Sequence, residues 1–279
     1  MTSHDVVGAM RHILNMKKIG HGGTLDPMAA GVLPVFVGKA TRFLEYAVEG
    51  NKVYRALITF GTKTDTGDAE GKLIATSEVK TLTQEEIKAA LASFVGAGKQ
   101  IPPMYSAISI GGKKLYKLAR EGIEIERQPR DIYIHRLDML YYKNNELMVE
   151  VECSKGTFIR TLSEDIAAKM GMVGTMSFLL RRQVGAFTLE HGFTLEEIKA
   201  APEKCVLPME MALADFPVLQ VNKLQGMRIA QGVATTVRNI EDGVTYKIVT
   251  DDDLVVGLAL GQAGKLQGTK IINIPVVEK

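Results

Sequence analysis

Two stretches in the middle of the chain alternate in the way paired β-strands do, and this feature narrows the possible folds most. Apolar side chains occupy every second position of residues 147–153, with methionine or glutamate between them. Residues 131–142 form a neighbouring strand-like run, and Lys143, Asn144 and Asn145 separate the two as a turn would. Because successive side chains of a strand point to opposite faces, the two runs predict a hairpin with one buried face.

A further strand is predicted over residues 52–60, where Tyr54, Ala56, Ile58 and Phe60 share one face. The predicted strands do not alternate regularly with helices, as the βαβ units of a doubly wound sheet would. We therefore expect an α+β fold with a mixed, mainly antiparallel central sheet flanked by helices and loops.

The predicted helices are marked by their ends. Thr2, Thr83 and Thr194 are each followed three residues later by an acidic side chain, which is the pattern of a capping box. The first of these helices is expected to run to about Lys18. Another helix is predicted from about Thr157 to Met170, before Gly171.

The predicted secondary structure changes after Pro217, where short β-rich runs predominate. A short helix is predicted over residues 222–231, and β-rich runs follow at 245–249, 254–260 and 270–277. A chain of 279 residues exceeds one typical domain and falls short of two. We therefore expect a main domain over residues 1–215 and a small β-barrel-like domain over 216–279.

Several classes of protein and of site are excluded or unsupported. About 18 consecutive apolar residues, which a spanning helix needs, are absent, so we expect no membrane partner. The first residues lack the basic and then apolar pattern of a secretory signal. Cys153 and Cys205 are far apart in sequence, and we expect them to be buried thiols of a cytoplasmic protein. The histidines lack zinc-ligand spacing, and no serine lies in a Gly-x-Ser-x-Gly elbow. Gly38-Lys39 lacks the spacing of a phosphate loop, and residues 65–71 fit a turn better than a calcium loop.

The loop around Asp26 concentrates reactive and permissive residues. Three glycines, a histidine and a threonine precede Asp26 within seven residues, and Pro27 follows it. An aspartate in such a loop can act as a nucleophile or base when a neighbouring cation keeps it ionised. An Asx-Pro turn, with the carboxylate accepting backbone amides, is the alternative, and spacing alone favours it.

Arg160 is placed where a cation is unfavourable. The segment from Cys153 joins a predicted strand to a predicted helix, and Arg160 falls in the first turn of that helix. The helix dipole disfavours positive charge there, so a carboxylate partner would explain the residue. An arginine that faces solvent is an equal alternative. Tyr54, on its strand, is by default a core residue with its hydroxyl at an edge.

Residues 99–130 carry a net charge of +4 and also contain tyrosines and paired glycines. Basic residues interleaved with aromatic ones suit a loop laid along an RNA backbone. Without other information, a solvated basic surface is the more common explanation.

Taken together and in order, these segments resemble the bacterial tRNA pseudouridine-55 synthases of the TruB type, and the match covers nearly the whole chain. The motifs that carry the resemblance lie at residues 21–34, 52–55, 61–68, 102–107, 116–120 and 153–160. The resemblance implies a pseudouridine synthase-like catalytic domain followed by a PUA-like RNA-binding module. It also makes Asp26 a functional residue instead of a turn residue.

The resemblance implies that uridine in the T loop of tRNA, at position 55, is isomerised to pseudouridine without a cofactor or metal. Asp26 matches the attacking aspartate, Arg160 its paired arginine, and Tyr54 the tyrosine that stacks on the uracil and assists proton removal. Detachment, rotation and rejoining of the base consume no water and change no oxidation state. The base must first leave the RNA stack, which costs a few kcal/mol.

The resemblance also implies a set of substrate-binding positions. His21 would fill the space of the everted base, Leu179 would form an apolar wall, and residues 99–130 would close on the T stem-loop. The expected substrate-binding residues are His21, Leu179, Lys113, Lys114, Arg120 and Asp68. We expect a monomer that acts on tRNA without a small-molecule cofactor.

Members of the family usually begin with a strand that carries Lys-Pro-x-Gly just before the residues that are Thr2-Ser3 here, and this sequence starts at Met1. Because that strand is missing, a non-catalytic tRNA-binding or folding module stays open as an alternative. The same chemistry on another RNA is a second, separate alternative.

Overall fold

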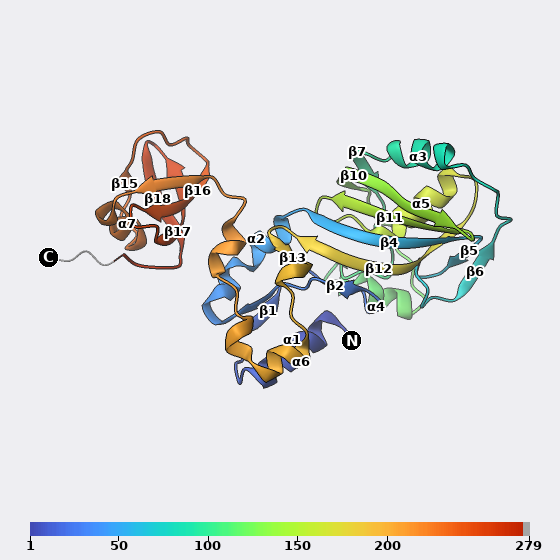
Figure 1. The fold of residues 1–279 in the computed structure, drawn as a ribbon, viewed down its shortest axis with the longest axis horizontal. Helices are drawn as coiled ribbons and strands as arrows, with labels where there is room; N and C mark the ends of the chain where they lie inside the picture. The colour runs from blue at the N-terminus through green and yellow to red at the C-terminus, as the bar shows by residue number, and fades with distance from the viewer. Residues whose placement is uncertain (276–279) are drawn as a thin grey trace. The chain divides into compact units, whose positions relative to one another are not determined.

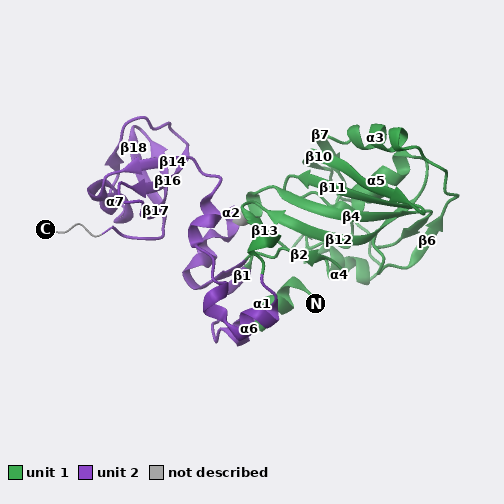
Figure 2. Ribbon diagram, in the orientation of Figure 1, with its two compact units in different colours: residues 1–9, 21–34, 48–192 green, residues 10–20, 35–47, 193–279 purple. Residues whose placement is uncertain are grey.

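The computed structural model describes residues 1–275, which form two compact units (Figures 1 and 2). Unit 1 comprises residues 1–9, 21–34 and 48–192, and unit 2 comprises residues 10–20, 35–47 and 193 onward. The α-helices are α1 (Ser3–Ile13), α2 (Leu44–Glu49), α3 (Gln84–Ala92), α4 (Leu115–Arg120), α5 (Ile159–Lys169), α6 (Leu195–Ala200) and α7 (Lys223–Ala230). The 3-10 helices are η1 (Gly38–Phe43), η2 (Leu189–His191), η3 (Pro202–Cys205) and η4 (Met209–Leu213).

Unit 1 is organised around a mixed, mainly antiparallel sheet, as predicted. Its strands follow the order β13-β12-β4-β11-β10-β7, all antiparallel, and β2 pairs with β12 in parallel (Figure 1). The bounds are β13 (Phe187–Thr188), β12 (Gly174–Val184), β4 (Lys52–Phe60), β11 (Glu146–Cys153), β10 (Arg130–Lys143), β7 (Gly96–Gln100) and β2 (Ala30–Gly31). The strand at 52–60 and the hairpin at 131–153 are therefore confirmed.

One face of this sheet is buried under helices. Ala56 and Ile58 of β4 are fully buried, in the alternation that the sequence predicts, and they share a core with Ile87 of α3 and Ile166 of α5. The capping box of Thr83 and Glu86 begins α3. At about 25 cal/mol per Å² of apolar surface removed from water, such side chains are the main stabilising contribution to the unit.

The other face of the sheet carries a cluster of charged side chains. The carboxylate of Glu150, on β11, binds Arg55 of β4 (2.9 Å), Arg136 of β10 (3.1 Å) and Arg182 of β12 (2.9 Å). We call these four residues the Glu150 cluster. Burial raises the pKa of Glu150, but hydrogen bonds to the three arginines outweigh it and lower that pKa to about 2. The cluster ties four neighbouring strands together.

The basic segment at 99–130 is a structured excursion between β7 and β10. It contains the short hairpin of β8 (Ser109–Ile110) and β9 (Lys113–Lys114), and then α4. Another small hairpin, β5 (Thr62–Thr64) with β6 (Leu73–Thr76), follows β4, and β1 (Ile19–His21) pairs with β3 (Val35–Val37). The β1–β3 pair brackets residues 22–34, which we call the Asp26 loop.

The C-terminal part of unit 2 contains a five-stranded sheet in the order β14-β16-β17-β18-β15, packed with α7 around its own apolar core. The strands are β14 (Val218–Val221), β16 (Thr245–Thr250), β17 (Val255–Gln262), β18 (Lys265–Ile271) and β15 (Thr235–Thr236). Residues 10–20, 35–47 and 193–215 also belong to unit 2. The predicted domain boundary after residue 215 stays a prediction.

Two predicted elements are wrong in their bounds. The first helix ends at Ile13 and not near Lys18, because Asn15 adopts a left-handed conformation (φ 46°). The last strand runs over Lys265–Ile271, not 270–277, because a tight turn at Ala263 and Gly264 starts it earlier. Residues 276 and 277 of that prediction lie outside the described residues. No helix within the described residues is long and apolar enough to cross a membrane.

Candidate active site

The Asp26 loop is fixed by backbone contacts at several points. The Gly22 amide donates to the Pro34 carbonyl (2.8 Å), and the Ala29 amide donates to the Asp26 carbonyl (2.9 Å). Buried Ser3 of α1 accepts from the Leu25 amide (2.9 Å) and donates to its carbonyl (3.3 Å). These bonds hold the residue next to Asp26 from the side of α1.

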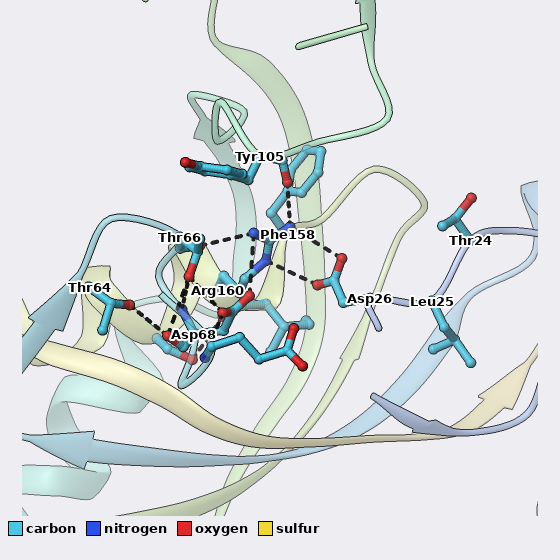
Figure 3. Close-up of polar contacts among 12 residues, drawn as sticks. Thr24, Leu25, Asp26, Thr64, Thr66, Asp68, Tyr105, Phe158 and Arg160 are labelled. Carbon is cyan, nitrogen blue, oxygen red and sulfur yellow. Dashed lines mark hydrogen bonds and ion pairs between the residues drawn. The ribbon is translucent and has the colours of Figure 1, made fainter. Parts of the chain in front are cut away.

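The carboxylate of Asp26 forms a two-point ion pair with Arg160 (Figure 3). Nε of Arg160 lies 3.0 Å from Oδ2 of Asp26, and Nη2 donates to Oδ1 at 3.2 Å. Fork-shaped contacts of this kind fix the orientation of both groups. Among the hydrogen bonds of the described residues, none joins this carboxylate to a backbone amide, so the Asx-Pro turn alternative is not what the structure shows.

Arg160 is the second residue of α5, as predicted, and its side chain is only 6% exposed. Buried Gln100 positions the start of this helix, since its side chain accepts from the Phe158 amide (2.9 Å) and donates to the Phe158 carbonyl (3.3 Å). The guanidinium also donates to the carbonyls of Thr66 (2.9 Å) and Tyr105 (2.7 Å). The solvent-facing alternative is therefore wrong.

Asp68 provides a second negative charge for Arg160, 3.6 Å from Nη1. Its side chain is 8% exposed, and it accepts hydrogen bonds from the Thr66 hydroxyl (2.6 Å) and the Glu70 amide (3.2 Å). These contacts make Asp68 an internal partner of Arg160 (Figure 3), and its predicted role in binding substrate stays a prediction.

Burial dominates the electrostatics of Asp26. It raises the pKa of this carboxyl above the ordinary value, the Arg160 charge lowers it in part, and the nearby charge of Asp68 raises it again. Arg160 is thus the main group that favours the ionised form, but it does not bring the pKa back to that of an ordinary aspartate. The ionised form of Asp26 therefore depends on the charge of Arg160.

Tyr54 and Leu179 lie on adjacent strands. Tyr54 of β4 is half-buried against the core, and burial raises the pKa of its hydroxyl. Leu179 of β12 is 4% exposed and pairs in register with Ala56 of β4. Both residues belong to the buried face of the sheet, on which Met28 and Ala29 of the Asp26 loop also pack.

His21 ends β1 at the entrance of the Asp26 loop. Its Nδ1 is buried and has no hydrogen-bond partner among the described residues, and burial lowers the pKa of the ring, which favours the neutral form. Lys113, Lys114 and Arg120 lie in the excursion before β10. The Lys113 and Lys114 side chains are exposed; that of Lys114 donates to the Ala107 carbonyl (2.8 Å), and none of the three contacts Asp26.

Arg181 is a residue that the sequence analysis missed. It is 2% exposed and donates to the carbonyls of Gly23, Thr24 and Val32, in the same loop as Asp26. Strand alternation is its one sequence signal, because in a regular strand Arg181 and Arg182 point to opposite faces; the structure has a register shift between Arg181 and Gln183. Nothing in the sequence says which of the two is buried. Among the described residues, no group of three or more His, Cys, Asp or Glu is arranged to hold a metal ion.

Comparisons with known proteins give a consistent result. Residues 11–159 match the family described as TruB family pseudouridylate synthase (N terminal domain), and residues 160–214 match the tRNA pseudouridylate synthase B C-terminal domain. The tRNA pseudouridine synthase B of Symbiobacterium thermophilum is 46% identical over 241 residues, covering 85% of this chain and 80% of the relative. That of Caldanaerobacter subterraneus subsp. tengcongensis is 40% identical over 273 residues, covering 97% and 95%.

The solved structures agree at the level of the fold. A chain in the structure described as a Cbf5-Nop10-Gar1 complex superposes with a TM-score of 0.76 at 24% identity, over 99% of this chain and 82% of the other. A chain in an H/ACA RNP bound to a substrate RNA containing 2'-deoxyuridine gives 0.72 at 23% identity, over 99% and 82%.

Proposed function

The chain belongs to the TruB family of pseudouridylate synthases and converts uridine in tRNA to pseudouridine, and we propose that its target is the T-loop uridine at position 55, with Asp26 as the nucleophile. The observation that carries the assignment to Asp26 is its two-point ion pair with Arg160, formed across 134 positions of sequence. A carboxylate in a buried site that is oriented by a fixed cation is what a nucleophile of this kind requires.

The reaction needs one carboxylate and accurate positioning. The Asp26 carboxylate attacks the everted nucleoside, at the ribose or at the base, and the N1–C1′ bond breaks. The uracil turns, the C5–C1′ bond forms and the bond to Asp26 breaks, which regenerates the carboxylate. N1 gains a proton and C5 loses one. Tyr54 stacks on the uracil and assists removal of the C5 proton. Because atoms and electrons balance within the nucleoside, no cofactor or metal is expected.

The remaining residues bind the RNA in this proposal. Neutral His21, with an unpartnered buried nitrogen, occupies the space that the everted base leaves. Leu179 contributes an apolar wall, and Asp68 holds Arg160. The exposed Lys113 and Lys114 contact phosphates of the T stem-loop together with Arg120, as the charge of this excursion suggests.

A purely non-catalytic tRNA-binding module is not favoured, because the ion pair that the chemistry needs is assembled in unit 1. Since the substrate is tRNA, we expect the protein to act in the cytoplasm, and one copy of the chain contains all the groups named above. The monomeric state is therefore part of the proposal.

The test is Asp26→Asn, assayed on a tRNA transcript by nucleoside mass analysis. Loss of pseudouridine with retained tRNA binding is expected, because the amide cannot act as the nucleophile. The matched control is Asp131→Asn, at an aspartate whose side chain is 88% exposed, and it should turn over at the parent rate. A transcript with cytidine at position 55 should give no product. Turnover of the parent protein on that transcript, or by Asp26→Asn, would contradict the proposal.

A further inference from the structure

Arg181 is a fully buried cation, and its surroundings show why it is tolerated there. Its side chain is among the largest fully buried side chains of the described residues and is 2% exposed. Among the described residues it forms no ion pair with a carboxylate. Three carbonyls surround it instead: those of Val32 (2.8 Å from Nε), Thr24 (3.2 Å from Nη1) and Gly23 (3.1 Å from Nη2). Burying an arginine costs several kcal/mol, so this position has to serve a purpose.

The three carbonyls lie on both sides of Asp26 in the chain. Gly23 and Thr24 precede the aspartate, and Val32 follows it. The backbone of Arg181 adds a fourth connection, because its carbonyl accepts from the Val32 amide at 2.8 Å. One residue of β12 therefore holds both ends of the Asp26 loop, while Arg160 of α5 holds the carboxylate itself.

The same guanidinium lies next to Tyr54. Arg181 and Tyr54 are register partners on β12 and β4. The charged or titratable groups that face the Tyr54 phenol are Arg181 from β12, Cys153 from β11 and Asp26 from the loop, and Arg181 is the cation of the three. Its charge and hydrogen bond lower the pKa of the phenol, against the stronger effect of burial.

We propose that Arg181 is a positioning residue that sets the Asp26 loop and the Tyr54 hydroxyl relative to each other through one buried guanidinium. This inference rests on the proposed function, because the relative position of Asp26 and Tyr54 affects turnover only if both residues act in the reaction. Arg181 touches no RNA, because it is enclosed by protein. Its loss acts on the chemical step and leaves the affinity for tRNA unchanged.

The experiment compares Arg181→Lys and Arg181→Gln with Arg182→Lys. The control changes the next residue of the same strand, which points to the opposite face and keeps its charge beside Glu150. For each variant, kcat, KM and the Kd for a tRNA transcript are measured, together with hydrogen exchange of residues 22–34 and the melting temperature. The lysine variant retains the charge and can reach fewer carbonyls, whereas the glutamine variant loses the charge.

We expect kcat to fall about 100-fold in Arg181→Gln, the size associated with a misplacement of about 1 Å, with Kd within twofold of the parent. Exchange should rise within residues 22–34 and stay unchanged in the central sheet. The alkaline part of the pH–rate profile should move to higher pH in Arg181→Gln and remain near the parent position in Arg181→Lys, because only the former removes the charge beside Tyr54. Arg182→Lys should match the parent.

Three outcomes would overturn the inference: a parental kcat in both Arg181 variants, a fall in kcat matched by an equal rise in Kd, or an unchanged exchange pattern. If Arg181→Gln does not fold, Arg181→Lys decides, by its kcat and by exchange in the loop. An inactive parent protein would instead refute the proposed function, so the two failures are distinguishable.

Discussion

Gly31→Ala tests whether the close approach of β2 to β12 sets the position of the Asp26 loop. Gly31 has φ +109°, and a Cβ there would lie 2.1 Å from the Arg181 carbonyl oxygen, far inside contact distance. Gly96, at the start of β7, has φ +110° and open space around it. Alanine at either position meets the same unfavourable φ. The two variants therefore differ mainly in the clash.

The size of the difference follows from the bonds that the clash breaks. The unfavourable φ costs about 1–3 kcal/mol in each variant. To relieve the clash, β2 must move away from β12, which removes the Val32 amide bond to the Arg181 carbonyl and the Arg181 Nε bond to the Val32 carbonyl. At about 1 kcal/mol for each bond, Gly31→Ala should be about 2 kcal/mol less stable than Gly96→Ala.

The assay pairs thermal unfolding with turnover. At about 2–4 °C per kcal/mol, the melting temperature of Gly31→Ala should lie about 4–8 °C below that of Gly96→Ala. Its kcat should fall about 100-fold because the loop shifts, and Gly96→Ala should retain the parent kcat. Equal melting temperatures and equal kcat in the two variants would refute the reasoning.

Three further predictions follow from charge. Arg160→Lys should move the acidic limb of the pH–rate profile to higher pH, because burial already raises the pKa of Asp26 and the variant weakens the opposing charge; an unmoved limb would count against this. Glu150→Gln should destabilise the protein by about 1–2 kcal/mol. The fall in the pKa of Glu150 from 4.5 to about 2 corresponds to at most about 3 kcal/mol, and solvent screening at the partly exposed arginines reduces this value. Because the folded-state pKa is depressed, this stability is present above pH 4.5 and is lost as the pH falls toward 2, which unfolding at several pH values measures. Replacing Lys113 and Lys114 by glutamine should reduce the slope of log affinity against log salt by about 1–2, as filter binding would show.

Much of the main sheet could be predicted because its strands alternate with little ambiguity. Residues 52–60 and 131–153 match the structure closely, since one face of each strand is buried and the period of two is visible. The final strand was misplaced because residues 271–277 are rich in β-branched side chains, whereas pairing is decided by the turn at Ala263 and Gly264. Where a turn and a propensity compete, the turn sets the register.

The candidate site was predicted in part. A cation in the first turn of a helix is unfavourable, so Arg160 indicated a carboxylate partner, and the resemblance identified Asp26 as that partner. The surroundings of the pair could not be read in this way. Asp68 acts through a buried ion pair with Arg160, and Arg181 through backbone carbonyls. The sequence does not show that Asp68 faces Arg160, nor which of Arg181 and Arg182 is buried.

The bond from Arg160 to the Tyr105 carbonyl has a consequence for mutagenesis. Tyr105 belongs to the excursion that carries the exposed lysines, so a shift in that excursion changes the hydrogen-bonding of the guanidinium that orients Asp26. A substitution of an exposed residue in this excursion can therefore slow turnover even if that residue does not contact the substrate. A mutational scan of the excursion that measures activity alone cannot separate weaker RNA binding from a changed orientation of the Arg160 guanidinium. The affinity for RNA has to be measured for the same variants.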